Sequence, residues 1–271
     1  MLPDRKNSLA NSRRPPEIYP EFSKGAVNRA GRKLAEGSGT DSDAKIIENW
    51  RAAHSHILNT FQATLRLKAK KSGVRPPVQR IKRLKTIENK LLRYPGMQLA
   101  RMHDIVGCRV IFNDIDELNE FRKSFNRSRF VHKRKVKKDD DGASVGAYNY
   151  INVPKESGYR GIHDVFEFRA KQSGKENSKG GEKWNGLLIE IQYRTNVQHA
   201  WATAVEICDS YKGHHGKFSD APEEYLRYFL IASELLARKH ENFEGYLSAE
   251  ETFDLLVEFV DLEYRYGMLA T

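Results

Sequence analysis

The sequence of 271 residues has little cysteine and no long apolar segment. Its two cysteines, Cys108 and Cys208, are too few for a disulfide framework, and their apolar contexts are typical of small core residues in a reducing compartment. No run approaches the ~18 consecutive apolar residues of a membrane helix, and residues 1–20 lack the apolar segment of a secretory signal. These absences predict a soluble, cytoplasmic protein without a membrane partner.

Standard nucleotide-binding motifs are also missing, because the sequence has no Walker loop, no Gly-x-Gly-x-x-Gly and no set of kinase motifs. The chain is nevertheless basic, with a formal net charge of +10. Lysine and arginine dominate residues 5–33, 66–93 and 129–138, whereas the last part of the chain is acidic. Ordinary solubility charge is one explanation. The uneven distribution favours a specific phosphorylated partner, either nucleotide or nucleic acid.

The order of the apolar patterns predicts an α+β domain with a mixed sheet of about five strands, flanked by helices and extended by helices at both ends. Residues 1–40 are expected to form a basic, partly disordered arm and a short helix. Residues 41–215 form the main domain, and residues 216–271 form C-terminal helices that pack on it. The strands are expected within residues 106–112, 130–138, 159–169 and 186–195, and the helices within residues 21–36, 41–71, 79–95, 114–125, 196–206, 222–241 and 248–264.

Residues 186–206 combine a strand pattern with a helix pattern. Glu190, Gln192 and Arg194 share one face of the predicted strand, with about 7 Å between successive members. A solvated sheet face would also explain three polar positions. A second carboxylate, Asp104, stands beside another predicted strand, and this favours a functional site. The opposite face of residues 186–195 is apolar, with Leu187, Ile189, Ile191 and Tyr193.

Two carboxylates in one cleft would repel each other or take up protons unless cations were present. If Asp104 and Glu190 meet, Mg²⁺ held by one or two carboxylates and completed by water and substrate phosphates is the natural solution. Nearby cations would neutralise charge on a transferring phosphoryl group. Glycoside hydrolysis also uses paired carboxylates but does not require so many cations. The basic residues expected around the pair are Arg80, Lys82, Lys90, Arg109 and Arg194.

One aromatic side chain, Tyr159, stands where a predicted loop meets a predicted strand. A nucleotide base can stack on such a ring, an interaction of roughly 1–3 kcal/mol in single-strand recognition. The alternative is that the ring simply packs against the protein, and for a single loop tyrosine without other information this alternative is favoured.

Four segments, in the same order, resemble the synthetase domain of the RelA/SpoT family of alarmone synthetases over roughly residues 79–212. The family usually has serine at the positions of Thr86 and Gly161. The four segments are a basic ATP-binding segment at residues 80–90, an Asp-x-x-Gly-x-Arg motif at 104–109, an acceptor loop at 150–163 (YINVPKESGYRGIH) and a Glu-x-Gln-x-Arg-Thr signature at 190–195.

The resemblance implies a nucleotidyltransferase-like fold and pyrophosphoryl transfer, in which the 3′-hydroxyl of an acceptor nucleotide attacks the β-phosphorus of ATP and AMP leaves. It implies that Asp104 and Glu190 are catalytic and hold Mg²⁺, with Glu190 acting instead, or also, as the general base. The implied ATP-binding residues are Arg80, Lys82, Thr86, Lys90 and Arg109. The implied acceptor-binding residues are Lys155, Tyr159, His163, Gln192 and Arg194.

GDP or GTP is the expected acceptor, giving a (p)ppGpp-type alarmone. Residues 198–206, 30–31 and 49–51 resemble a branch of small stand-alone synthetases that includes toxic members. Adenine nucleotides and the 3′ CCA end of tRNA are therefore alternative acceptors, and a neutralising antitoxin and a homo-oligomer are further expected partners. A catalytically decayed nucleotide- or RNA-binding module is the remaining alternative, supported by Thr86 and Gly161.

Overall fold

The computed structural model describes residues 17–128, 130–135, 137–138, 144–145, 148–151, 153–171, 181–212 and 221–267. Residues 1–16 of the expected basic arm lie outside the described residues. The α-helices are α1 (Lys24–Ala35), α2 (Asp41–Ser72), α3 (Leu84–Arg93), α4 (Ile115–Asn126), α5 (Asn196–Lys212), α6 (Glu223–Glu241) and α7 (Thr252–Tyr266). The strands are β1 (Val78–Ile81), β2 (Val106–Phe112), β3 (Lys133–Lys135), β4 (Lys137–Lys138), β5 (Ser144–Val145), β6 (Tyr148–Asn149), β7 (Ile162–Glu167) and β8 (Leu188–Thr195).

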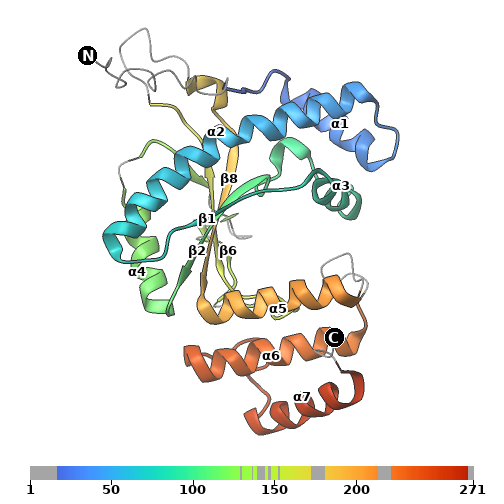
Figure 1. Ribbon diagram of the computed structural model, residues 1–271, viewed down its shortest axis with the longest axis vertical. Coiled ribbons are helices and arrows are strands. Elements are labelled where there is room, and N and C mark those ends of the chain that lie inside the picture. Colours follow the sequence, from blue (N-terminus) through green and yellow to red (C-terminus); the bar gives the residue numbers. More distant parts are fainter. Residues whose placement is uncertain are drawn as a thin grey trace, which may run out of the picture.

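A six-stranded mixed sheet forms the centre of the molecule (Figure 1). Its strand order is β1-β2-β8-β7-β3, with β6 beside β7, and β4 and β5 form a separate pair. Strand β8 runs parallel to β2 and antiparallel to β7. The predicted α+β class with a mixed sheet and flanking helices is confirmed.

Helix α2 covers the apolar face of the sheet together with α4. Thr40 and Asp43 form a capping box at the start of α2, and Gly73 ends it in the left-handed conformation, with φ 69°. Side chains at three- and four-residue steps along α2 are buried, so the helix is amphipathic. The buried stripe includes Ile47, Trp50, Ile57, Phe61 and Leu65.

The segment over residues 79–95 differs from its prediction, which was a basic helix or a turn followed by a helix. Residues Val78–Ile81 form β1 instead, antiparallel to β2, and only Leu84–Arg93 are helical. All four β1 side chains are exposed. With neither face buried, the strand does not need the alternating apolar pattern by which a strand is predicted from sequence. Backbone pairing with the edge of β2 is what makes this segment a strand.

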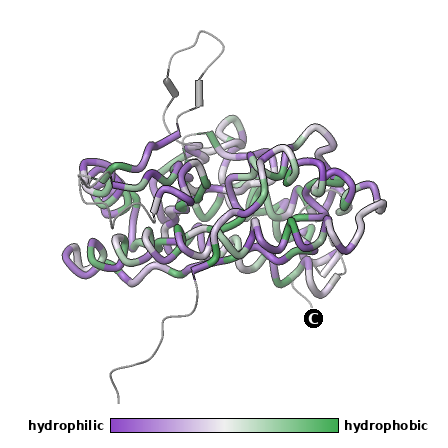
Figure 2. The backbone as a smooth tube through the Cα atoms, turned by 90° about the horizontal axis from the view of Figure 1, so that it is seen from above, coloured by the Kyte–Doolittle hydropathy of each residue, from purple (hydrophilic) through white to green (hydrophobic). Residues whose placement is uncertain are grey.

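Helices α5, α6 and α7 stack below the sheet in Figure 1 and share a second hydrophobic cluster. Trp201 of α5 donates its indole N–H to the Phe229 carbonyl of α6 at 2.8 Å, and both side chains are buried. Apolar and polar stretches alternate along the helices (Figure 2). In the part of the chain that the structure describes, no helix has the length and apolar character needed to cross a membrane.

Candidate active site

The polar face of β8 carries the candidate site, as its alternation predicted. Glu190 and Gln192 are half-buried on one face, whereas Ile189, Ile191 and Tyr193 are fully buried on the other. The β8 register places Glu190 beside Gly107 of β2, and Gln192 between Arg109 of β2 and His163 of β7. Three strands therefore contribute polar side chains to the same face.

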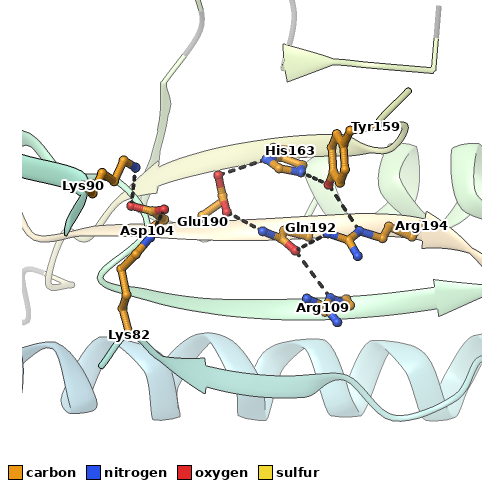
Figure 3. Close-up of polar contacts among 9 residues, drawn as sticks. All are labelled: Lys82, Lys90, Asp104, Arg109, Tyr159, His163, Glu190, Gln192 and Arg194. Carbon is orange, nitrogen blue, oxygen red and sulfur yellow. Dashed lines mark hydrogen bonds and ion pairs between the residues drawn. The ribbon is translucent and has the colours of Figure 1, made fainter. Parts of the chain in front are cut away.

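A chain of hydrogen bonds runs along this face (Figure 3). His163 Nδ1 lies 3.0 Å from Glu190 Oε1, and Gln192 Nε2 donates to Glu190 Oε2 at 2.7 Å. The other ring nitrogen of His163 contacts the Tyr159 hydroxyl, to which Arg194 Nε donates at 3.2 Å. The Glu190 carboxylate is thus linked through an imidazole to the ring of the expected acceptor loop.

Burial alone would raise the pKa of Glu190. The charge of His163, together with hydrogen bonds from His163 and Gln192, outweighs this effect and lowers the pKa to about 2. Glu190 is therefore a carboxylate throughout the neutral range and a weak proton acceptor. This electrostatic setting suits a residue that holds a cation or orients a hydroxyl group.

Asp104 lies just before β2 and is held by two lysines. Lys82 is paired with Oδ2, and Lys90 Nζ is 2.8 Å from Oδ1. Burial would raise the pKa of Asp104, but the charges and hydrogen bonds of both lysines lower it well below its usual range. Burial is also the main reason that the pKa of Lys82 is lowered. Asp104 is consequently ionised and already charge-compensated.

Asp104 and Glu190 lie in the same region of the sheet, because the start of β2 lies beside the part of β8 that carries Glu190. Gly107, three residues after Asp104, is the direct neighbour of Glu190, and a Cβ at Gly107 would lie only 2.9 Å from the Glu190 carbonyl oxygen. Glycine is required here by the close approach of the two backbones. The charge of Asp104 also acts on the pKa of Glu190, opposing its ionisation.

The remaining predicted ATP-binding residues come from β1, α3 and β2. Arg80 pairs with Gly107 in the β1–β2 register and so faces the same side as Glu190. Arg109 Nε donates to Gln192 Oε1 at 3.4 Å. Thr86 is half-buried in the first turn of α3, the helix that carries Lys90. The structure therefore brings the predicted donor residues together from β1, α3 and β2.

The predicted acceptor residues lie at the other end of the polar face. The Lys155 ammonium is 5.2 Å from the centre of the Tyr159 ring, and the Arg194 guanidinium is 4.9 Å from it. Sequence reasoning missed Tyr150, whose ring lies 4.4 Å from the Lys155 ammonium and edge-on to both Tyr159 and His163. Its place as the first residue of the predicted acceptor loop was the available signal.

A buried network behind the acceptor loop was also missed. Arg160 Nη1 lies 2.8 Å from Glu241 Oε2, and both side chains are almost fully buried. Thr195 Oγ1 and Gln198 Nε2 donate to the other Glu241 oxygen at 2.6 and 2.8 Å. The Ser233 hydroxyl donates to the Gly158 carbonyl at 2.5 Å. Helix α6 thereby fixes the loop that carries Tyr159 and the end of β8.

The carboxylates of the site do not by themselves complete the coordination of a metal ion. Among the described residues, no group of three or more histidine, cysteine, aspartate or glutamate side chains is arranged to hold one. Mg²⁺ needs only one or two carboxylates when substrate phosphates and water complete its coordination. The ionised oxygens of Asp104 and Glu190 fit an ion that arrives with a nucleotide, and they do not form a cage of protein ligands alone.

The chain is similar in sequence to known proteins. The family model described as "Region found in RelA / SpoT proteins" matches residues 79–216. An uncharacterized protein of Mycobacterium tuberculosis (strain H37Rv) is 24% identical over 205 residues, which cover 76% of this chain and 65% of the relative. GTP pyrophosphokinase YwaC of Bacillus subtilis is 27% identical over 130 residues, 46% of this chain and 52% of the relative. The chain thus matches less than two thirds of the length of each of these relatives.

Solved structures show the same fold. Small alarmone synthetase 2 of Bacillus subtilis superposes with a TM-score of 0.55 at 19% identity, covering 72% of this chain and 94% of that chain. Small alarmone synthetase 1 of the same organism, bound to its product pppGpp, gives a TM-score of 0.52 at 23% identity, covering 71% and 90%. At these identities the similarity concerns the arrangement of helices and strands.

Proposed function

The chain belongs to the RelA/SpoT family, and we propose that it is a nucleotide pyrophosphokinase. It transfers the β,γ-pyrophosphate of ATP to the 3′-hydroxyl of GDP or GTP and releases AMP. The observation that carries this proposal is the hydrogen-bonded row from Glu190 through His163 to Tyr159, on the same sheet face as the lysine-bound Asp104 region. The row provides a carboxylate for the reacting hydroxyl and a ring for the acceptor base.

On the donor side, Lys82 and Lys90 are proposed to exchange Asp104 for ATP phosphates when the nucleotide binds. Both ammonium groups already converge on one carboxylate, so they are positioned to receive another anion. The complete proposed ATP-binding set is Arg80, Lys82, Thr86, Lys90 and Arg109. Mg²⁺ at Asp104 and Glu190 would neutralise charge on the transferred phosphates.

In the transfer, the acceptor 3′-oxygen forms a bond to the β-phosphorus of ATP. The bond between that phosphorus and the oxygen bridging to the α-phosphorus breaks, and AMP leaves with the bridging oxygen. Glu190 accepts a hydrogen bond from the attacking hydroxyl, and the proton passes to solvent. Because the pKa of Glu190 is about 2, we favour this orienting and metal-holding role over full deprotonation by Glu190.

The proposed function is tested by incubating the purified protein with Mg²⁺, γ-labelled ATP and one acceptor at a time. GDP, GTP, ADP, ATP and deacylated tRNA are the acceptors to compare. Label on the 3′ position of GDP or GTP, with one AMP released per transfer, is the expected result. If none of the five acceptors becomes labelled while ATP remains intact, the proposal is wrong.

RNA is a second candidate acceptor class, favoured by the net charge of +10. Under this alternative, the same residues would transfer pyrophosphate to the 3′-terminal nucleotide of tRNA. Label would then reach tRNA in preference to GDP, and tRNA binding would weaken steeply with added salt.

Tyr159 offers a specific test of the acceptor site. Replacing Tyr159 by alanine is expected to raise the KM for the acceptor by tenfold or more, because base stacking on an aromatic ring contributes about 1–3 kcal/mol. The KM for ATP should change little, because Tyr159 is bonded to His163 and Arg194, which are predicted acceptor residues. Among the predicted ATP-binding residues, only Arg109 acts on Tyr159, through its charge. Steady-state kinetics with each substrate varied in turn measures both values.

The Tyr159→Phe variant is the matched control, because it keeps the ring and removes only the hydroxyl bonded to His163 and Arg194. It should retain most of the acceptor affinity. Equal losses in both variants would assign the effect to the hydroxyl network and contradict stacking.

A further inference from the structure

Helix α7 has two apolar faces, one packed and one exposed. The packed face meets α6 through Leu255, Phe259 and Leu262. The other face consists of five large apolar side chains, each between 46% and 90% exposed. We call these five residues the α7 stripe: Phe253, Leu256, Val257, Val260 and Tyr264.

The α7 stripe has the form of a helix-packing surface. Single exposed apolar residues are common on proteins and need no explanation. The members of the stripe, however, follow three- and four-residue steps, so they form one continuous row along the helix. From Phe253 to Tyr264 the row extends about 16 Å. Such a row is the pattern by which one helix packs against another.

The α7 stripe is remote from the candidate active site. Helices α5, α6 and α7 stack in this order below the sheet, so α5 and α6 lie between α7 and β8 (Figure 1). Helix α7 also lies beyond residues 79–216, which the family model matches. A partner that packs on the stripe therefore leaves the polar face of β8 accessible.

The spacing of the α7 stripe matches a second copy of the same helix. Four of its members are separated by steps of four, three and four residues, a spacing that reads the same in both directions: Phe253, Val257, Val260 and Tyr264. When two such helices pack antiparallel about a two-fold axis at the middle of the row, Phe253 meets the partner's Tyr264. Val257 then meets the partner's Val260. Two-fold interfaces require this kind of self-complementary surface.

The charges beside the α7 stripe fit the same arrangement. Asp254 is in the first turn of α7 and Arg265 in the last, and at 3.6 residues per turn both point to the same side of the helix. Antiparallel packing brings Asp254 within about one turn of the partner's Arg265, twice per dimer, whereas parallel packing places like charges together. Arg265 already pairs with Asp261, and its five N–H donors are enough for two carboxylates. Glu258, on the same side, is neutralised by Arg227.

We propose that α7 is a dimerisation surface, on which a second copy of the chain packs antiparallel through the α7 stripe. The inference does not depend on the proposed function, because it concerns assembly and not turnover. One helix from each copy forms a small interface, so the dimer is expected to be reversible and its fraction to rise with protein concentration.

Sedimentation velocity of the full chain, from about 1 μM to about 200 μM, measures the dimer fraction. Val257→Asp places a carboxylate in the middle of the apolar row and should weaken dimerisation at least tenfold. Leu67→Asp is the matched control, because Leu67 on α2 is 58% exposed and Val257 is 55% exposed. It should dimerise like the wild-type protein. Both variants should keep the wild-type unfolding temperature, since both positions are exposed.

Charge reversal tests the antiparallel arrangement separately. Asp254→Arg and Arg265→Asp alone should each weaken dimerisation about tenfold, because two attractive pairs become repulsive. The double variant should return to within about threefold of the wild-type affinity, since the opposite charges meet again. A local folding defect would not be repaired by the second change.

Three outcomes would overturn the proposal. A wild-type chain that stays monomeric over the whole range leaves the α7 stripe to a different protein. Unchanged dimerisation of Val257→Asp means that the two copies meet on another surface. A double charge variant that associates no better than the single variants contradicts the antiparallel pairing. The label-transfer assay does not bear on any of these results, so failure of the proposed function remains distinguishable.

Discussion

Replacing Glu190 by glutamine is expected to lower kcat for pyrophosphoryl transfer by about 1,000-fold, the size of effect seen when a group that stabilises transition-state charge is removed. The amide keeps the shape of the side chain but removes the negative charge that His163 and Gln192 surround. It can neither hold Mg²⁺ well nor orient the acceptor hydroxyl as a carboxylate does. Label transfer from ATP under saturating substrates measures kcat, and equilibrium titration measures ATP binding, which should change by less than threefold.

Two further variants make the Glu190 result interpretable. Asp104→Asn should also reduce kcat, and it should weaken Mg²⁺-dependent ATP binding, because it removes one of the two carboxylates proposed to hold Mg²⁺. Glu120→Gln, an exposed position on α4, should have the activity and thermal stability of the wild-type protein. If Glu190→Gln retained more than a tenth of the wild-type kcat, Glu190 would not be a catalytic residue. Absence of label transfer in the wild-type protein and in all variants alike would favour the decayed-module alternative.

Replacing Glu241 by alanine is expected to lower the free energy of unfolding by about 3–5 kcal/mol, because the change leaves a buried charge without its partner. The stranded group is Arg160, whose side chain is only 4% exposed. Thr195 and Gln198 would lose their acceptor as well. Urea unfolding monitored by fluorescence measures the difference. Because Arg160 follows Tyr159 in the chain, the acceptor KM should rise in the same variant.

Two further variants separate the effect of burial on stability from the effect of ion pairing. Asp261→Ala removes a carboxylate from the exposed Asp261–Arg265 pair on α7 and should cost less than about 0.5 kcal/mol. The double change Arg160→Met with Glu241→Leu should recover part of the stability lost in Glu241→Ala, since no unpaired charge remains. A Glu241→Ala protein as stable as the Asp261→Ala protein would contradict the assignment.

Much of the sheet was predictable because its buried strands carry local patterns. The two-residue alternation in residues 186–195 correctly separated the polar face of Glu190 from the apolar face of Ile191. Strand β2 alternates in the same way. By contrast, β1 has four exposed side chains, so only its pairing with β2 defines it. A local pattern predicts burial well, but it does not reveal an edge strand whose side chains all face solvent.

The site shows the same division between local and long-range information. Resemblance of local motifs pointed to the residues of one region of the sheet, including Asp104 and Glu190. It did not show that Lys82 and Lys90 share Asp104, or that His163 binds Glu190, because these contacts depend on strand register and helix placement. Glu241 is further still from the motifs, and its role follows only from how α6 packs against the acceptor loop.

The position of β8 has a consequence for synthesis of the protein. Among the described strands β8 comes last in the chain, yet it lies between β2 and β7, which do not pair with each other. Until β8 is available, no strand joins β2 to β7, so the part of the sheet beside Asp104 and the part that carries His163 stay unconnected. They join when β8 is released and inserts, after closing a long loop, a step that is intrinsically slow. Because β8 also carries Glu190, the second carboxylate of the candidate site reaches its place in the same event that completes the sheet.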